Sequence, residues 1–157
     1  MPTADQRQLN RPGDRLVGPR RVVAAASLGV LAVAQAVVGV WALAAPQSFY
    51  ARFPASGHAW VALLPPYNEH LVRDVGALSL AVTVLLAVAA VVPTRLLIRT
   101  AAVAFAVYAV PHTVFHAFHL EGFSSVDAIA QTAGFLLQLA AVGVALATTA
   151  GPGRRSE

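Results

Sequence analysis

Four stretches of this chain are apolar over a length that suits a lipid bilayer, and this repeated feature constrains the fold more than any other. A helix rises about 1.5 Å per residue, so roughly 20 apolar residues cross the ~30 Å hydrocarbon layer. Soluble domains usually carry about 25% charged residues, whereas this 157-residue chain carries 11%. The sequence therefore predicts an all-α, integral membrane four-helix bundle. The predicted spans are residues 22–45, 72–92, 100–119 and 126–149.

Arginine is distributed unevenly around these spans and indicates how the chain is oriented. The net charge of +4 comes from arginine, because the sequence contains no lysine. Nine of the eleven arginines precede the first span, separate the second from the third, or follow the fourth, and only Arg52 and Arg73 do not. Positive residues favour the cytoplasmic side of a membrane. We therefore expect a multi-pass plasma-membrane protein with cytoplasmic N and C termini: a disordered basic tail (1–21), a transmembrane domain (22–150) and a second tail (151–157).

Composition also limits the partners and the chemistry. The arginines flank apolar segments rather than lining a polar surface, so the sequence predicts the lipid bilayer as a partner and no nucleic acid. The absence of cysteine excludes disulfides, thiolate metal sites and CxxC redox chemistry.

A cleaved signal peptide is the alternative interpretation of residues 22–45, and the small residues Ala42, Ala44 and Ala45 support it. However, the apolar region of a signal peptide is only about 7–15 residues long, and Pro46 would crowd a cut after Ala44. We therefore interpret this segment as a span. Its cleavage would leave three crossings.

Polar and ionisable residues gather where the second and fourth spans meet the external surface. The candidate ligand-pocket residues are Glu69, His70, Arg73, Asp74, Asp127 and Gln131. They form three pairs spaced four residues apart, which places both members of a pair on one helical face. Ionisable groups within a span cost about 2.5–3.5 kcal/mol each, so they usually face other helices and find partners. We expect Arg73 to pair with Asp127, Asp74 or Glu69 between the helices.

Three histidines share a face at the end of the third span. His112, His116 and His119 follow one another at i, i+4 and i+7. Histidine is a common metal ligand, so His70, His112 and His116 are candidate ligands of a metal or haem, with a carboxylate completing the coordination. The sequence HTVFH lacks the glutamate of an HExxH motif. His119 lies at the predicted boundary, and we expect it to be solvated.

Three interpretations of these residues remain open. The first is a metal or haem site, as in a membrane oxidoreductase subunit. The second is an external pocket for a small or lipidic ligand, or for a membrane protein partner, in which histidines and carboxylates form hydrogen bonds or transfer protons. The third is structural: polar rings anchor the chain at the membrane surface, and Gln35 and Gln138 join helices. The second is the leading hypothesis and the first its alternative. No residue is identified as catalytic.

Two segments carry a resemblance to a known group of proteins. They are Trp41–Pro54 (WALAAPQSFYARFP) and Asn68–Gly76 (NEHLVRDVG). With the four short spans, they make residues 22–150 resemble the small four-helix bacterial membrane proteins called DoxX-like. Because most members of this group have no known activity, the resemblance implies an architecture and no particular reaction.

Small residues predict where helices approach closely. Gly29, Ala32, Ala36 and Gly39 form a stripe on the first span. On the fourth span the corresponding residues are Ala130, Gly134 and Ala141. Small side chains let helix backbones come together inside a membrane, where lipid supplies no hydrophobic drive for association.

Overall fold

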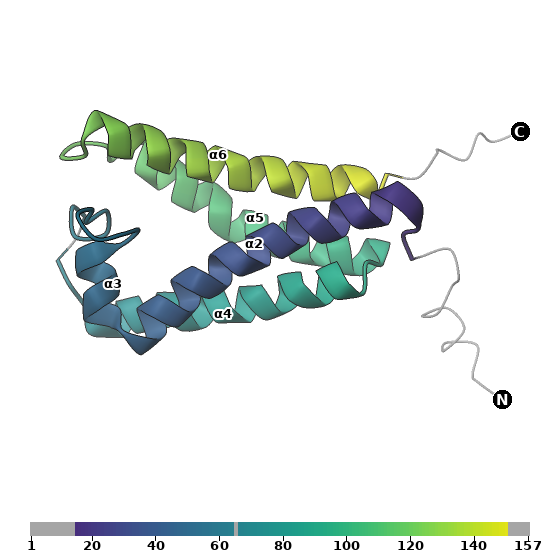
Figure 1. Cartoon of the computed structure of the whole chain (residues 1–157), viewed down its shortest axis with the longest axis horizontal. Helices are drawn as coiled ribbons and strands as arrows, with labels where there is room; N and C mark the ends of the chain where they lie inside the picture. The colour runs from purple at the N-terminus through teal and green to yellow at the C-terminus, as the bar shows by residue number, and fades with distance from the viewer. Residues whose placement is uncertain (1–14, 65, 151–157) are drawn as a thin grey trace, which may run out of the picture.

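The computed structural model describes residues 15–64 and 66–150, and this part of the chain contains five helices. They are α2 (Gly18–Ala44), α3 (Pro46–Arg52), α4 (Glu69–Val91), α5 (Arg95–Ala117) and α6 (Ser125–Thr148) (Figure 1). All except α3 are long and apolar enough to cross a membrane. The prediction of an all-α chain with four helices of spanning length is therefore confirmed for the described residues. Each predicted span lies largely on one of these helices.

Local sequence explains where three of the long helices begin. Asn68, Thr94 and Ser124 each accept a hydrogen bond from the backbone N–H three residues later. Side chains of this kind satisfy one of the backbone N–H groups that the first turn of a helix leaves unpaired. They fix the starts of α4, α5 and α6 directly after the preceding connections.

The start of α2 corrects the sequence prediction. Residues 18–21 were assigned to a disordered tail, but they form the first turn of α2. Pro19 suits this turn because its missing N–H needs no helical partner there. Just before it, the buried Leu16 donates its backbone N–H to the Pro93 carbonyl at 3.0 Å, which attaches this end of the chain to the α4–α5 turn. The rest of the predicted tails, 1–14 and 151–157, lies outside the described residues.

The four long helices form two pairs, α2 with α4 and α5 with α6 (Figure 1). α2 also packs against α6 near the end of the molecule where the termini lie, and the pairs separate toward the opposite end. The largest fully buried side chains are Leu28, Leu31, Leu86, Ile98 and Phe105, which belong to one core cluster. At the opposite end, α3 and the connection to α4 lie between the two pairs (Figure 1). The apolar core therefore fills the half of the molecule near the termini, whereas the two helix pairs are separated in the other half.

Gly39 and Gly76 form a close approach of α2 to α4. A Cβ atom added at Gly76 would lie 2.6 Å from the backbone nitrogen of Leu43 and 3.0 Å from the Gly39 carbonyl oxygen. A Cβ at Gly39 would lie 2.9 Å from the Leu80 side chain. The predicted role of Gly39 in close packing agrees with this geometry, whereas a Cβ at Gly29 would meet nothing within 4 Å.

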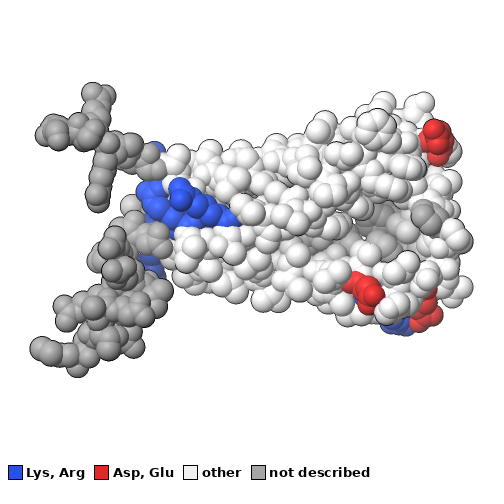
Figure 2. All heavy atoms as spheres, turned by 180° about the vertical axis from the view of Figure 1, so that it is seen from behind, with Lys and Arg blue, Asp and Glu red and all other residues white. Residues whose placement is uncertain are grey.

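Charged residues gather at the two ends of the molecule, as Figure 2 shows. At the end near the termini, here named the arginine end, Arg20 donates to the Ala150 carbonyl at 3.0 Å, and Arg95 and Arg99 donate to the Thr149 carbonyl. Cations at the C-terminus of a helix satisfy its free carbonyls and interact favourably with its dipole. The opposite end carries carboxylates (Figure 2) and is here named the acidic end. Glu69 and Asp127 lie in the first turns of α4 and α6.

Candidate functional site

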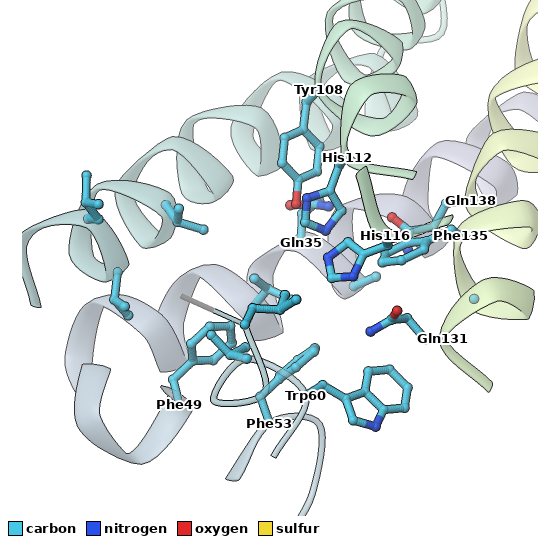
Figure 3. A pocket seen from close by; sticks show the side chains of 18 residues that line it. Gln35, Phe49, Phe53, Trp60, Tyr108, His112, His116, Gln131, Phe135 and Gln138 are labelled. Atoms are coloured by element: carbon cyan, nitrogen blue, oxygen red, sulfur yellow. The ribbon is translucent and has the colours of Figure 1, made fainter. Parts of the chain in front are cut away.

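A cavity of about 330 Å³ lies between the two helix pairs in the half of the molecule near the acidic end (Figure 3). All four long helices, α3 and the connection from α3 to α4 contribute to its wall. Most lining side chains are apolar, and the aromatic ones are Phe49, Phe53, Trp60, Tyr108 and Phe135. Ligand sites of proteins typically have this character: a concave apolar wall with a few polar groups, and a volume of about 300 Å³ or more.

His116 and Gln131 are the most notable polar groups of the cavity. They lie next to one another, His116 on α5 and Gln131 on α6 (Figure 3). Both are buried, with exposed fractions of 8% and 2%. Nevertheless, His116 Nδ1 and Gln131 Oε1 have no hydrogen-bond partner. A buried polar atom without a partner costs about 1–3 kcal/mol, and most buried polar groups therefore have one.

A second polar group lies deeper along α5. The Tyr108 hydroxyl lies against the side chain of Gln35, which is 4% exposed on α2 (Figure 3). The His112 ring stacks on Tyr108 with a centroid distance of 5.2 Å and meets Phe135 edge-on at 5.1 Å. Tyr108, His112 and His116 are four residues apart, so one face of α5 presents all three to the cavity.

Asp127 holds the connection between α3 and α4 against the start of α6. Its Oδ1 accepts a hydrogen bond from Trp60 Nε1 at 2.9 Å and lies 2.6 Å from His58 Nδ1, while its Oδ2 accepts from Ser124 Oγ at 2.8 Å. Trp60 lines the cavity and Asp127 does not. Asp127 is therefore a positioning residue, because it fixes the tryptophan that covers one side of the cavity.

The predicted pocket residues at the start of α4 do not line the cavity. Arg73 pairs with Glu69 of its own helix at 2.8 Å, and its guanidinium also donates to the Leu43 carbonyl at the end of α2. His70 lies 3.4 Å from Asp74 and is 83% exposed at its side chain. The expected ion pair of Arg73 is thus formed with Glu69, within one helix rather than between helices. Of the six pocket candidates, Gln131 alone lines the cavity.

The three candidate metal ligands are not brought together. His112 and His116 lie on the cavity wall with ring centroids 4.6 Å apart, whereas His70 is exposed on α4. Within residues 15–64 and 66–150, no group of three or more histidines and carboxylates is placed to hold a metal ion. His119, expected to be solvated, is exposed, and its ring stacks on Phe115 at 3.9 Å.

No protein family model, no curated protein and no solved structure matches this chain. The resemblance to DoxX-like proteins therefore stays a prediction, and the cavity has to be interpreted from its own residues.

Several lining residues were not predicted to belong to a site. The sequence predicts an interhelical role for Gln35 and Gln138 but no cavity, and it predicts no role for Tyr108. The spacing of Tyr108 to the two following histidines was a usable signal, because it extends their helical face by one turn. Trp60 gave no such signal, since its position depends on how the connection from α3 to α4 folds back between the helix pairs.

Proposed function

We propose that this chain is an integral plasma-membrane protein that binds a small ligand in a cavity near its external surface. In this proposal the four long helices form a transmembrane bundle, and both termini are cytoplasmic. Their length and hydropathy support the membrane location. The arginine end then corresponds to the cytoplasmic surface, in agreement with the preference of positive residues for that side.

Single cysteines test this orientation, because the natural chain has none. We expect Ser56→Cys, in the exposed connection after α3, to react with a membrane-impermeant maleimide in intact cells. Ser156→Cys, in the C-terminal tail, should react only after the cells are made permeable. Gel-shift detection of the labelled protein measures both. The reverse pattern, or recovery of the protein in the soluble fraction, would contradict the proposed topology.

The observation that carries the ligand proposal is the pair of unpartnered buried atoms, His116 Nδ1 and Gln131 Oε1, which belong to side chains on the wall of a mostly apolar cavity. The two side chains are neighbours across α5 and α6, but neither of these atoms has a hydrogen-bond partner in the structure. They are therefore free to bind a guest, and the surrounding apolar wall contributes affinity when the guest leaves a more polar environment.

Bromobenzene tests whether the cavity accepts a small guest, because bromine quenches tryptophan fluorescence at short range. The chain has two tryptophans, so Trp41→Phe leaves Trp60, on the cavity wall, as the single reporter. In lipid nanodiscs, we expect bromobenzene to quench Trp60 with a saturable component. Trp60→Phe is the comparison: the remaining Trp41 does not line the cavity but packs behind Phe49 and Phe53 of its wall, so a bound guest should quench it less than Trp60. Quenching without saturation, equal in both variants, would overturn the proposal.

A further inference from the structure

The cavity wall carries no formal charge. None of its lining residues is Asp, Glu, Lys or Arg, and its polar members are glutamines, histidines and a tyrosine. The carboxylates nearest in sequence are engaged elsewhere: Asp74 with His70, Glu69 with Arg73, and Asp127 with His58 and Trp60. A charged guest would lose its hydration without gaining a counter-ion, which is costly in an apolar site. The wall therefore selects an uncharged guest.

The two unpartnered atoms define what this guest must supply. Gln131 Oε1 can only accept a hydrogen bond, so it requires a donor. His116 Nδ1 donates or accepts according to its tautomer, and it belongs to the neighbouring side chain (Figure 3). A hydroxyl group both donates and accepts. Both atoms are covered in the structure, so the Gln131 amide has to turn toward the cavity before a guest can reach them. One hydroxyl can then satisfy both atoms, which neither a hydrocarbon nor a pure acceptor can do.

The rim of the cavity indicates the direction of entry. Leu71 and Val75 line the cavity and are also 59% and 43% exposed on α4, and Ala34 is a lining residue exposed on α2. These residues belong to helices apolar enough to cross a membrane, so the openings beside them face the region that lipid would occupy. Figure 2 shows the surface hollowed between the helix pairs on this half of the molecule. The guest can thus reach the cavity sideways.

We propose that the cavity binds an uncharged, membrane-soluble hydroxy compound that enters from the lipid. Its hydroxyl group donates to Gln131 Oε1 and accepts from or donates to His116 Nδ1, and its apolar body packs among Phe49, Phe53 and Phe135. This inference rests on the proposed ligand-binding function and specifies the chemical class of the ligand.

The test compares 4-bromophenol with bromobenzene, which share a ring and a quencher and differ by one hydroxyl group. Both are titrated into the Trp41→Phe protein in nanodiscs, and affinities are expressed relative to the amount of each probe dissolved in the lipid. We expect the phenol to bind about tenfold more tightly, since it satisfies buried polar atoms that the hydrocarbon leaves unpaired. Gln131→Leu and His116→Phe, both in that background, should reduce this preference to about twofold or less.

Gln47→Leu is the matched control. Gln47 is an exposed amide on α3 that does not line the cavity. This variant should retain the preference. Gln131→Leu replaces an unsatisfied polar group with an apolar one of similar size, so this variant is expected to fold.

The outcomes separate the two proposals. If bromobenzene binds saturably and the phenol binds no better, the cavity accepts guests but the hydroxyl proposal is overturned, as expected if water alone satisfies the two atoms. If neither probe binds saturably, both proposals fail. A preference that Gln47→Leu removes as completely as Gln131→Leu would also overturn the assignment of the hydroxyl position.

Discussion

Gly76→Ala is expected to lower the free energy of unfolding by about 1–3 kcal/mol, and Gly76→Leu by more, because both force apart a close contact between α2 and α4. The methyl group of alanine would lie 2.6 Å from the Leu43 backbone nitrogen and 3.0 Å from the Gly39 carbonyl oxygen. Backbone atoms of a packed helix cannot turn away as a flexible side chain can. One helix must therefore move away from the other. Unfolding in mixed micelles with increasing amounts of denaturing detergent measures the resulting loss of stability.

Gly76→Ala is expected to change the shape of the cavity as well as to lower the stability. α2 and α4 together contribute one wall of the cavity, including Gln35 and Val72, so a displaced α4 changes its shape. Gly29→Ala and Gly143→Ala are the controls, since a Cβ at either glycine meets nothing within 4 Å. If Gly76→Ala unfolds at the same detergent fraction as these controls, the contact between α2 and α4 is not as close as described.

The sequence predicted the four long helices because length and hydropathy are properties of each segment by itself. The uninterrupted apolar blocks are visible without knowing any neighbour. The choice of helix partners was not predictable in this way. Gly29 and Gly39 both belong to the predicted small stripe of the first span, but Gly39 alone of the two meets another helix closely. Gly76, which makes the tightest contact, was not predicted to pack at all.

The same limit explains which of the predicted site residues line the cavity. Spacing shows that Glu69 and Arg73 share a face of α4, but not whether this face points toward α5 and α6. In the structure the two residues satisfy each other on an exposed face, while His116 and Gln131 point inward. Charged side chains were expected to mark the site because ionisable residues in spans are costly. The cavity instead gathers neutral polar groups, which are less costly to bury and give a weaker sequence signal.

Gly134→Leu is expected to change stability and ligand binding in opposite directions. Gly134 lines the cavity on α6, three residues after Gln131 and four before Gln138, and a Cβ there would meet nothing within 4 Å. A leucine side chain can therefore extend into the empty volume without displacing the backbone. Filling a cavity commonly stabilises a protein by about 0.5–2 kcal/mol. The same side chain occupies space that a guest needs, so the affinity for bromobenzene should fall about tenfold or more in the Trp60 quenching assay.

Gly143→Leu separates the cavity effect from the general effect of replacing a helical glycine. Gly143 lies on the same helix with open space at its Cβ, but it is exposed and does not line the cavity. Both variants gain the helix propensity of leucine over glycine, about 0.8–1 kcal/mol in soluble helices. Unfolding in mixed micelles measures the stability of both variants. The amount by which Gly134→Leu is more stable than Gly143→Leu is thus the contribution of filling the cavity. If Gly134→Leu is no more stable than Gly143→Leu and binds bromobenzene as the parent protein does, the space beside Gly134 is already occupied by the protein's own side chains, and the cavity is not a binding site.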